Sequence, residues 1–253
     1  MRRFFVPFLD QSAESFALPA DISHHMVKVL RLRREDTFDL CDGAGLCCRA
    51  VLEDAAQKKA WVRVLEWRPE AETAVHIELL QGMPKGERFD LVLQKNTELG
   101  VSAFMPVYTR RCQGRIALSK VDKKLQRWNK IVQEAARQCG RSWLPRVEKP
   151  QELVKALKSC TASLRLVLWE EAEVELNTIL PQQLEHLDAG IALLIGPEGG
   201  LERVEVECAQ KYGFVPVRFG PRILRTETAG FGVVAVLQYL YGDTGEKAGA
   251  GKG

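Results

Sequence analysis

From about residue 73 onward, apolar runs of strand length alternate with segments of helical periodicity. Candidate strands cover residues 75–81, 103–108, 165–169, 191–195 and 214–219, and candidate helices cover 87–99, 119–139, 151–159, 202–212 and 228–241. Strands joined through helices pack best side by side and parallel, with the helices over the sheet. The alternation therefore predicts an α/β domain with a mostly parallel sheet over residues 74–242.

The chain before this point has a different pattern. Short strand candidates at residues 4–6, 37–41, 47–52 and 61–67 follow one another closely, and Asp42-Gly43 is a strong hairpin signal between two of them. A short helix capped by Asp21 and running through His24 and His25 to Val29 is expected between strands. We predict a small β-barrel domain over residues 1–70, a linker at 68–73, and a flexible tail at 243–253.

Basic residues are concentrated in one segment. Residues 110–149 hold 12 Lys or Arg against 3 Asp or Glu, whereas the whole chain has a net charge of only +3. The segment includes a predicted helix, 119–139, that Ser119 and Asp122 would open as a capping box. Its apolar face holds Val121, Leu125, Trp128, Val132, Ala135, Ala136 and Cys139, and the opposite face holds Lys120, Lys123, Lys124, Arg127, Lys130 and Arg137.

A buried apolar face with cations opposite it suits a surface that follows a nucleic-acid backbone. Arg110, Arg111 and Arg141 extend the positive charge beyond both ends of the helix. A solvated helix surface is the simpler alternative for such a charge run.

The seven cysteines are scattered and contain no CxxC pair. Neither a disulfide framework nor a metal site is expected, and a reducing cytoplasm is the expected location. No apolar run reaches the length of a membrane helix, and the apolar stretch near the start is too short for a signal peptide.

Two loops of the predicted α/β domain have compositions suited to ligand binding. Residues 196–200, Gly-Pro-Glu-Gly-Gly, follow the most apolar strand, and their glycines let a ligand approach the backbone. The loop is not a Walker loop, and Glu198 would favour a neutral or cationic ligand such as an adenosyl group. Taken alone, the loop could also be only a tight turn.

The loop at residues 219–230 precedes the last helix. Its apolar pair Ile223-Leu224 needs a ligand ring or another subunit to cover it, while Thr226 and Thr228 are candidate helix caps. A third polar segment, residues 94–100, ends a helix before Gly100, and simple helix termination explains it.

Together these segments resemble the RsmE family of SPOUT-class RNA methyltransferases over nearly the whole chain. The resemblance rests on five motifs in order: His25-x-x-Lys28-Val29-Leu30-Arg31, Gln94-Lys95-x-x-Glu98-Leu99-Gly100-Val101, Glu134-x-x-Arg137-Gln138-Cys139-x-Arg141, Leu194-Ile195-Gly196-Pro197-Glu198-Gly199-Gly200 and Gly220-Pro221-Arg222-Ile223-Leu224-Arg225-Thr226-Glu227-Thr228-Ala229.

The resemblance implies a PUA-like N-terminal β-barrel, a SPOUT α/β domain with a deep trefoil knot, and a cytoplasmic homodimer. It implies S-adenosyl-L-methionine as the cofactor, no metal, and methylation of uracil N3 of one uridine in 16S ribosomal RNA of the small subunit. DNA and membrane are not expected partners. The general rule against knots would instead favour an unknotted sheet.

Residue by residue, the resemblance suggests three groups. The cofactor group is Leu168, Trp169, Glu170, Ile195, Gly196, Pro197, Glu198, Gly199, Gly200, Phe219, Gly220, Ile223, Leu224, Arg225, Thr226, Thr228 and Ala229. The RNA-binding group is His25, Lys28, Arg31, Arg110, Arg111, Lys120, Lys123, Lys124, Arg127, Lys130 and Arg141. For catalysis, the hypothesis is that Arg137 or Arg225 stabilises the uracil anion and Glu98 or Glu134 removes the N3 proton.

Three alternatives compete with this interpretation. A ribose 2′-O-methyltransferase of the same knotted class would use the same cofactor on a different atom. A non-catalytic RNA-binding assembly factor would use the barrel and the basic helix alone. A Rossmann dehydrogenase is disfavoured, because no GxGxxG loop follows the first strand of the domain.

Overall fold

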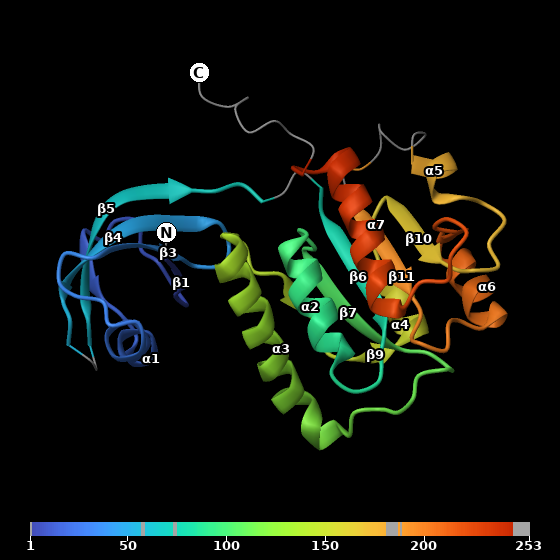
Figure 1. Ribbon diagram of the computed structural model, residues 1–253, viewed down its shortest axis with the longest axis horizontal. Helices are drawn as coiled ribbons and strands as arrows, with labels where there is room; N and C mark the ends of the chain where they lie inside the picture. The colour runs from blue at the N-terminus through green and yellow to red at the C-terminus, as the bar shows by residue number, and fades with distance from the viewer. Residues whose placement is uncertain (1, 57–58, 73–74, 181–186, 188, 245–253) are drawn as a thin grey trace. The chain divides into compact units, whose positions relative to one another are not determined.

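The computed structural model describes residues 2–56, 59–72, 75–180, 187 and 189–244, shown as ribbon in Figure 1. The chain forms two compact units. The first unit comprises residues 1–72 and 133–144, and the second comprises 73–132 and 145–253. The division at residues 70 and 74 stays a prediction, and most of the predicted tail, from residue 245, lies outside the described residues.

The first unit is built on a five-stranded sheet with the strand order β1-β3-β4-β5-β2. Only the β1–β3 pair is parallel. The elements are β1 (Arg3–Phe5), β2 (Ser15–Ala17), α1 (Ala20–His24), the π-helical turn η1 (His25–Val29), β3 (Thr37–Cys41), β4 (Leu46–Asp54), β5 (Trp61–Pro69) and the end of α3 (Leu118–Cys139).

The predicted strands and hairpin of this unit are present, with three differences. The expected Asp21 cap is wrong: α1 begins after Pro19 without a side-chain cap and continues as η1. The three-residue β2 has no clear sequence pattern, so it escaped prediction. The predicted linker is shorter, because β5 continues through Pro69.

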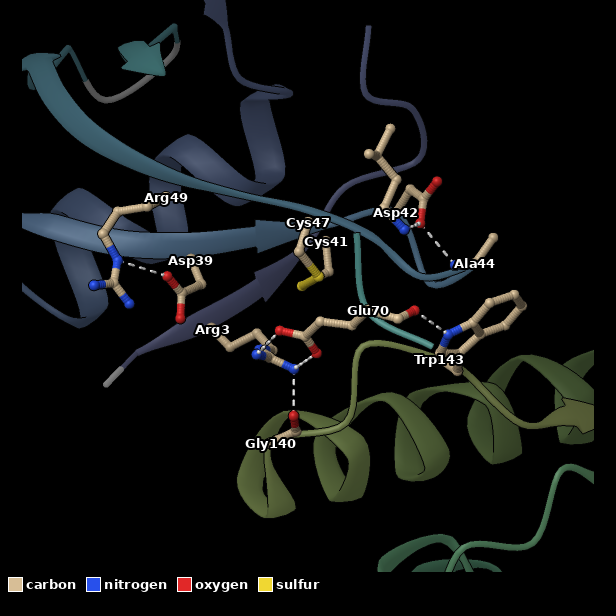
Figure 2. The surroundings of a disulfide bond; sticks show 11 residues. Arg3, Asp39, Cys41, Asp42, Ala44, Cys47, Arg49, Glu70, Gly140 and Trp143 are labelled. Carbon is tan, nitrogen blue, oxygen red and sulfur yellow. Dashed lines mark hydrogen bonds and ion pairs between the residues drawn. A yellow bond between two sulfur atoms is a disulfide. The ribbon is translucent and has the colours of Figure 1, made fainter. Parts of the chain in front are cut away.

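The hairpin between β3 and β4 carries a disulfide bond (Figure 2). Cys41 and Cys47 are directly opposite in the antiparallel register, with their Cα atoms 4.2 Å apart, and their sulfur atoms are bonded. The Asp42 carboxylate accepts hydrogen bonds from the backbone N–H groups of Ala44 (2.7 Å) and Leu46 (3.1 Å), which fixes the turn. The expectation that the cysteines stay reduced therefore fails at this pair, because a tight turn places two distant-looking cysteines side by side.

Residues 133–144 complete the first unit. Cys41 and Cys47 pack with Phe5, Ala136 and Leu144 in one apolar cluster. The Trp143 indole donates a 2.8 Å hydrogen bond to the backbone oxygen of Glu70, as Figure 2 shows. The helical segment at residues 133–139 is thus part of this unit's structure.

The second unit contains a parallel sheet with the order β12-β10-β11-β6-β7-β8, and β9 also pairs with β7. Its strands are β6 (Ile77–Gly82), β7 (Ala103–Tyr108), β8 (Arg146–Val147), β9 (Gln151–Glu152), β10 (Leu164–Leu168), β11 (Ile191–Ile195) and β12 (Val215–Val217). Every pairing between these strands is parallel, as predicted. The two-residue strands β8 and β9 are too short for a sequence signal.

Helices cover both faces of this sheet, because successive strand residues point to opposite sides. Leu79 packs in a core with helices α2 (Arg88–Glu98) and α7 (Thr226–Tyr241), which lie side by side in Figure 1. The next residue, Leu80, packs with α4 (Leu153–Ser159) and α6 (Arg203–Lys211). Two separate cores therefore hold the sheet between helical layers.

Helix α3 differs from its prediction at both ends. It begins at Leu118, so Ser119 lies inside the helix and the expected capping box is wrong. Cys139, expected on the apolar face, is exposed, while Trp128, Val132, Ala135 and Ala136 are buried as predicted. The one-turn helix α5 (Leu176–Ile179) was not predicted.

Candidate active site

A cavity of about 550 Å³ opens beyond the carboxyl ends of β10, β11 and β12. Parallel strands bring their carboxyl ends to one edge, where the following loops can surround a ligand. The cavity is lined by Arg88, Leu168, Trp169, Glu170, Ile195, Gly196, Pro197, Glu198, Gly199, Gly200, Leu201, Arg218, Phe219, Gly220, Pro221, Arg222, Ile223, Leu224, Arg225, Thr226 and Ala229.

The structure brings together nearly the whole cofactor group proposed from sequence. Of those 17 residues, 16 are among the described residues that line the cavity, and Thr228, exposed on α7, is the exception. Sequence reasoning missed Arg88, Leu201, Arg218, Pro221 and Arg222. Three of these stand within or beside the motifs, whereas Arg88 comes from a distant helix and carried no signal.

The glycine-rich loop after β11 packs closely against the loop after β6. A Cβ atom added at Gly82 would lie 2.6 Å from the backbone nitrogen of Pro197, and one added at Gly196 would lie 3.0 Å from the carbonyl carbon of Gly200. Gly200 has a positive φ of 72°, a conformation that favours glycine. These glycines are therefore required by close approach as well as by turn geometry.

A buried polar network fixes the base of the cavity. The fully buried Gln81, at the end of β6, donates hydrogen bonds to the Thr226 hydroxyl (2.8 Å) and to the backbone oxygen of Gly82 (3.1 Å). The Thr226 hydroxyl in turn donates to the backbone oxygen of Gly196 at 2.6 Å. Thr226 is therefore not the cap expected of it: α7 begins after Arg225 with no side-chain cap.

The carboxylate expected to attract a cation is engaged elsewhere. One Glu198 oxygen accepts hydrogen bonds from the Arg88 guanidinium (2.7 Å) and the backbone N–H of Lys85 (2.9 Å), and the other is buried without a partner. Glu170 is exposed and forms no ion pair or hydrogen bond within the described parts of the chain. Of the two carboxylates on the wall, Glu170 is the one free to meet a ligand.

Two arginines assigned to RNA contact the cavity loop instead. Arg111 donates a 2.9 Å hydrogen bond to the backbone oxygen of Gly199. Arg110 pairs with Glu202 at 3.2 Å, and its backbone N–H donates to the Glu205 carboxylate, which also caps α6 together with Glu202. Both arginines thus brace the loop that follows β11.

The loop after β12 separates its apolar pair. Leu224 is partly buried and packs against the main core, whereas Ile223 is 87 % exposed. Arg222 and Arg225 on either side are exposed and, among the described residues, contact no hydrogen-bonding or ionic partner.

The four catalytic candidates do not share one environment. Arg225 lines the cavity. Glu98 pairs with Lys95 at 2.9 Å and is not among the described lining residues. Glu134 and Arg137 belong to the first unit, where they form an ion pair, and Arg137 also lies 3.2 Å from Nε2 of His25. Because a guanidinium only donates, that ring nitrogen acts as the acceptor.

The remaining RNA-binding candidates fall into paired and unpaired cations. Arg127 is held by Glu87 and Asp90, a contact that raises its pKa chiefly through the Glu87 hydrogen bond. The Arg141 side chain is only 12 % exposed and lies 4.0 Å from Glu72. The side chains with no ionic partner in the described structure are Lys28, Arg31, Lys120, Lys123, Lys124 and Lys130.

Metal ligands and membrane helices were also sought. Within the described ranges, no group of three or more His, Cys, Asp or Glu side chains could hold a metal ion. No described helix combines the length and the apolar character needed to cross a membrane.

Comparison with known proteins gives matches to both parts of the chain. A family model described as an RNA methyltransferase domain matches residues 71–238, and one described as an RNA methyltransferase PUA domain matches residues 18–65. The ribosomal RNA small subunit methyltransferase E of Bacillus subtilis is 32 % identical over 249 residues, which cover 94 % of this chain and 96 % of that protein. Its counterpart from Mycobacterium tuberculosis is 33 % identical, with coverage of 92 % and 91 %.

Solved structures agree with these matches. Ribosomal RNA small subunit methyltransferase E from Neisseria gonorrhoeae, bound to S-adenosyl methionine, has a TM-score of 0.87 and 33 % identity, over 96 % of this chain and 99 % of that one. A Legionella pneumophila methyltransferase solved with the cofactor SAM has a TM-score of 0.86 and 33 % identity, over 95 % and 98 %. With its PUA-like first domain and parallel α/β second domain, this chain belongs to the ribosomal RNA small subunit methyltransferase E family.

Proposed function

We propose that this protein methylates a base of small-subunit (16S) ribosomal RNA with S-adenosyl-L-methionine as the methyl donor, and that the base is a uracil modified at N3. The cavity beyond β10, β11 and β12 carries the proposal, because its loops are the ligand-type loops of the sequence. The chain is similar over almost its full length to a methyltransferase solved with this cofactor.

The residues around the cavity fit the proposed cofactor. A volume of about 550 Å³ lies in the range of small-molecule sites, roughly 300–1,000 Å³. Leu168 and Leu224 offer apolar surface for an adenine ring, and the backbone of residues 196–200 offers polar groups at close range. The unpaired Glu170 carboxylate suits the ammonium group or the ribose hydroxyls.

The proposed reaction requires the uracil N3 proton to leave. The bound cofactor supplies an electrophilic methyl group for in-line displacement. Arg225, unpaired on the cavity wall, is placed to stabilise negative charge on the uracil oxygens, and Arg137 is the second candidate. Glu98 and Glu134 remain the proposed bases, and each would first have to leave its ion pair with Lys95 or Arg137.

The proposed RNA surface follows the unpaired cations. Lys120, Lys123, Lys124 and Lys130 on α3 are available to phosphates, and so are Lys28 and Arg31 beside η1 in the first unit. Arg31 has a positive φ of 55°, which is uncommon for a non-glycine residue and typical of functional turns. We leave Arg110, Arg111, Arg127 and Arg141 out of this surface because of their protein contacts.

We further propose a homodimer that works in the cytoplasm. Helix α7 leaves Tyr239 (67 %) and Leu240 (47 %) exposed and Phe231 and Val236 partly exposed, so an apolar face lacks cover. A second copy of the chain is the proposed cover. The trefoil knot stays a prediction of the family resemblance.

Calorimetric titration with S-adenosylmethionine tests the cavity. Gly82→Ala adds a methyl group 2.6 Å from Pro197, and Gly199→Val adds one near Arg111, so both variants should lose cofactor binding. Gly86→Ala is the control, because no atom lies within 4 Å of its added Cβ. An absence of binding to the wild type, with RNA affinity intact, would favour the non-catalytic assembly factor.

Nucleoside analysis of 16S RNA after reaction tests the chemistry. N3-methyluridine supports the proposed reaction, whereas a 2′-O-methyl nucleoside would assign the enzyme to ribose methylation. Arg137→Ala tests one catalytic candidate: near-normal turnover with normal RNA and cofactor binding would remove it.

A further inference from the structure

Four arginines line the cavity, and only two of them are neutralised. Arg88 pairs with Glu198 at 2.7 Å, and Arg218 donates to Glu175 at 2.8 Å. Arg222 and Arg225 have no such partner among the described residues, and they flank the apolar pair at the cavity mouth. The uncompensated positive charge around the cavity is therefore gathered on one short loop.

The apolar side chain between these arginines points away from the protein core. Ile223 is 87 % exposed, although full burial of such a side chain is worth about 1.5–3 kcal/mol. Its neighbour Leu224 packs against the core and already supplies an apolar wall on this side of the cavity. Ile223 is thus a free apolar tip beside a ligand cavity.

The surroundings of this tip indicate what covers it. An apolar side chain flanked by two unpaired guanidinium groups matches a partner with anionic groups around apolar faces. Stacked bases between phosphates have this chemistry. Uracil N3 lies on the pairing edge of the base, and enzymes that act on such an atom take the base out of its stack.

We propose that Ile223 is a wedge that enters the RNA stack and occupies the space left by the target base, while Arg222 binds a neighbouring phosphate. This inference rests on the proposed function, since it requires an RNA substrate whose base reaches the cavity. Apolar side chains inserted between base steps in this way stabilise the unstacked state. Ile223 then acts as a positioning residue for the substrate, with no contact to the transferred methyl group.

Steady-state methylation of two RNA substrates tests the wedge. One substrate is a hairpin that holds the target uridine stacked, and the other is a short single strand with the same uridine unstacked. Ile223→Ala should lower kcat/KM on the hairpin roughly 10- to 100-fold, and Ile223→Leu should restore it. On the single strand the loss should shrink to a few-fold, because little unstacking is needed.

Three measurements guard the conclusion. Val204→Ala, which shortens another exposed apolar side chain (48 %) outside the cavity lining, should leave both substrates unaffected. Cofactor affinity of Ile223→Ala should match the wild type in the calorimeter; a large loss would mean that Ile223 covers the cofactor, which overturns the proposal. Dissociation of a wild-type dimer by the same substitution would assign the tip to a subunit contact and overturn it as well.

A 2-aminopurine placed next to the target uridine reports unstacking directly. Its fluorescence should rise on binding of the wild-type protein and stay low with Ile223→Ala. An equal loss of kcat/KM on both substrates, or an unchanged fluorescence rise, would refute the wedge. Absence of methylation of either RNA by the wild type would instead refute the proposed function.

Discussion

The side-chain amide of Gln81 donates a 2.8 Å hydrogen bond to the hydroxyl of Thr226, which lies 145 residues further along the chain. The hydroxyl passes the connection to the backbone of Gly196, so three loops around one cavity share a buried network. Groups in such a network stabilise one another, because each would be costly to bury alone.

Breaking this network should destabilise the second unit. Gln81→Leu keeps the volume but removes the donor, and we expect a loss of about 1–3 kcal/mol in the free energy of unfolding and weaker cofactor binding. Thr226→Val should cost a similar amount, and the double variant should cost less than the sum, with a coupling of about 0.5–3 kcal/mol. Denaturant unfolding checks this; strictly additive losses would contradict the shared network.

The paired and unpaired cations on α3 should behave differently. Lys123→Ala should weaken RNA binding and reduce the slope of log affinity against log salt by roughly 0.7–0.9, since one phosphate contact is lost. Arg127→Ala should leave that slope unchanged and lower the thermal midpoint slightly, because Arg127 contacts Glu87 and Asp90. Binding titrations at several salt concentrations separate the two, and equal slopes for all three proteins would remove α3 from the RNA surface.

Cys48 should make stability depend on pH in the alkaline range. Burial raises the pKa of this thiol from 9.0 to about 11, so folding favours its protonated form. Its contribution is therefore fully present below pH 9 and is lost as pH rises toward 11. Unfolding titrations should show a decline between these values that is weaker in Cys48→Ala; identical slopes would contradict the assignment.

The Cys41–Cys47 bond should stabilise the first unit. Closing so short a loop is worth about 2 kcal/mol, and Cys47→Ser or a reductant should remove that amount. Intact mass measured without reductant should be lower than that of the fully reduced chain by two hydrogen atoms. Cys139→Ser, at an exposed free cysteine, is the matched control. A mass equal to seven free thiols would contradict the bond.

Patterns of neighbouring residues predicted the elements and the cavity well. Strand β11 has the predicted bounds, 191–195, because its burial on both faces leaves an uninterrupted apolar run. The loop residues could be grouped because the carboxyl ends of parallel strands converge on one edge. Knowing the strand directions was therefore enough to bring residues 168, 196 and 223 into one site.

Partners of charged side chains could not be predicted in this way. Glu198 is neutralised by Arg88, 110 residues away, and Arg111 is held by Gly199, 88 residues away. Charge counts treat each such residue as free, whereas the fold decides which ones remain available. The basic stripe accordingly loses Arg110, Arg111, Arg127 and Arg141 but keeps its lysines.

The composition of the first unit also bears on how the protein is made. Its sheet ends with β5, yet the apolar surface of Cys41 and Cys47 is covered by Ala136 and Leu144. A ribosome adding about 5–20 residues per second needs roughly 4–14 seconds to pass from Glu72 to Leu144. During that interval the nascent sheet exposes this cluster, so the order of synthesis leaves the domain made first waiting for a segment made later.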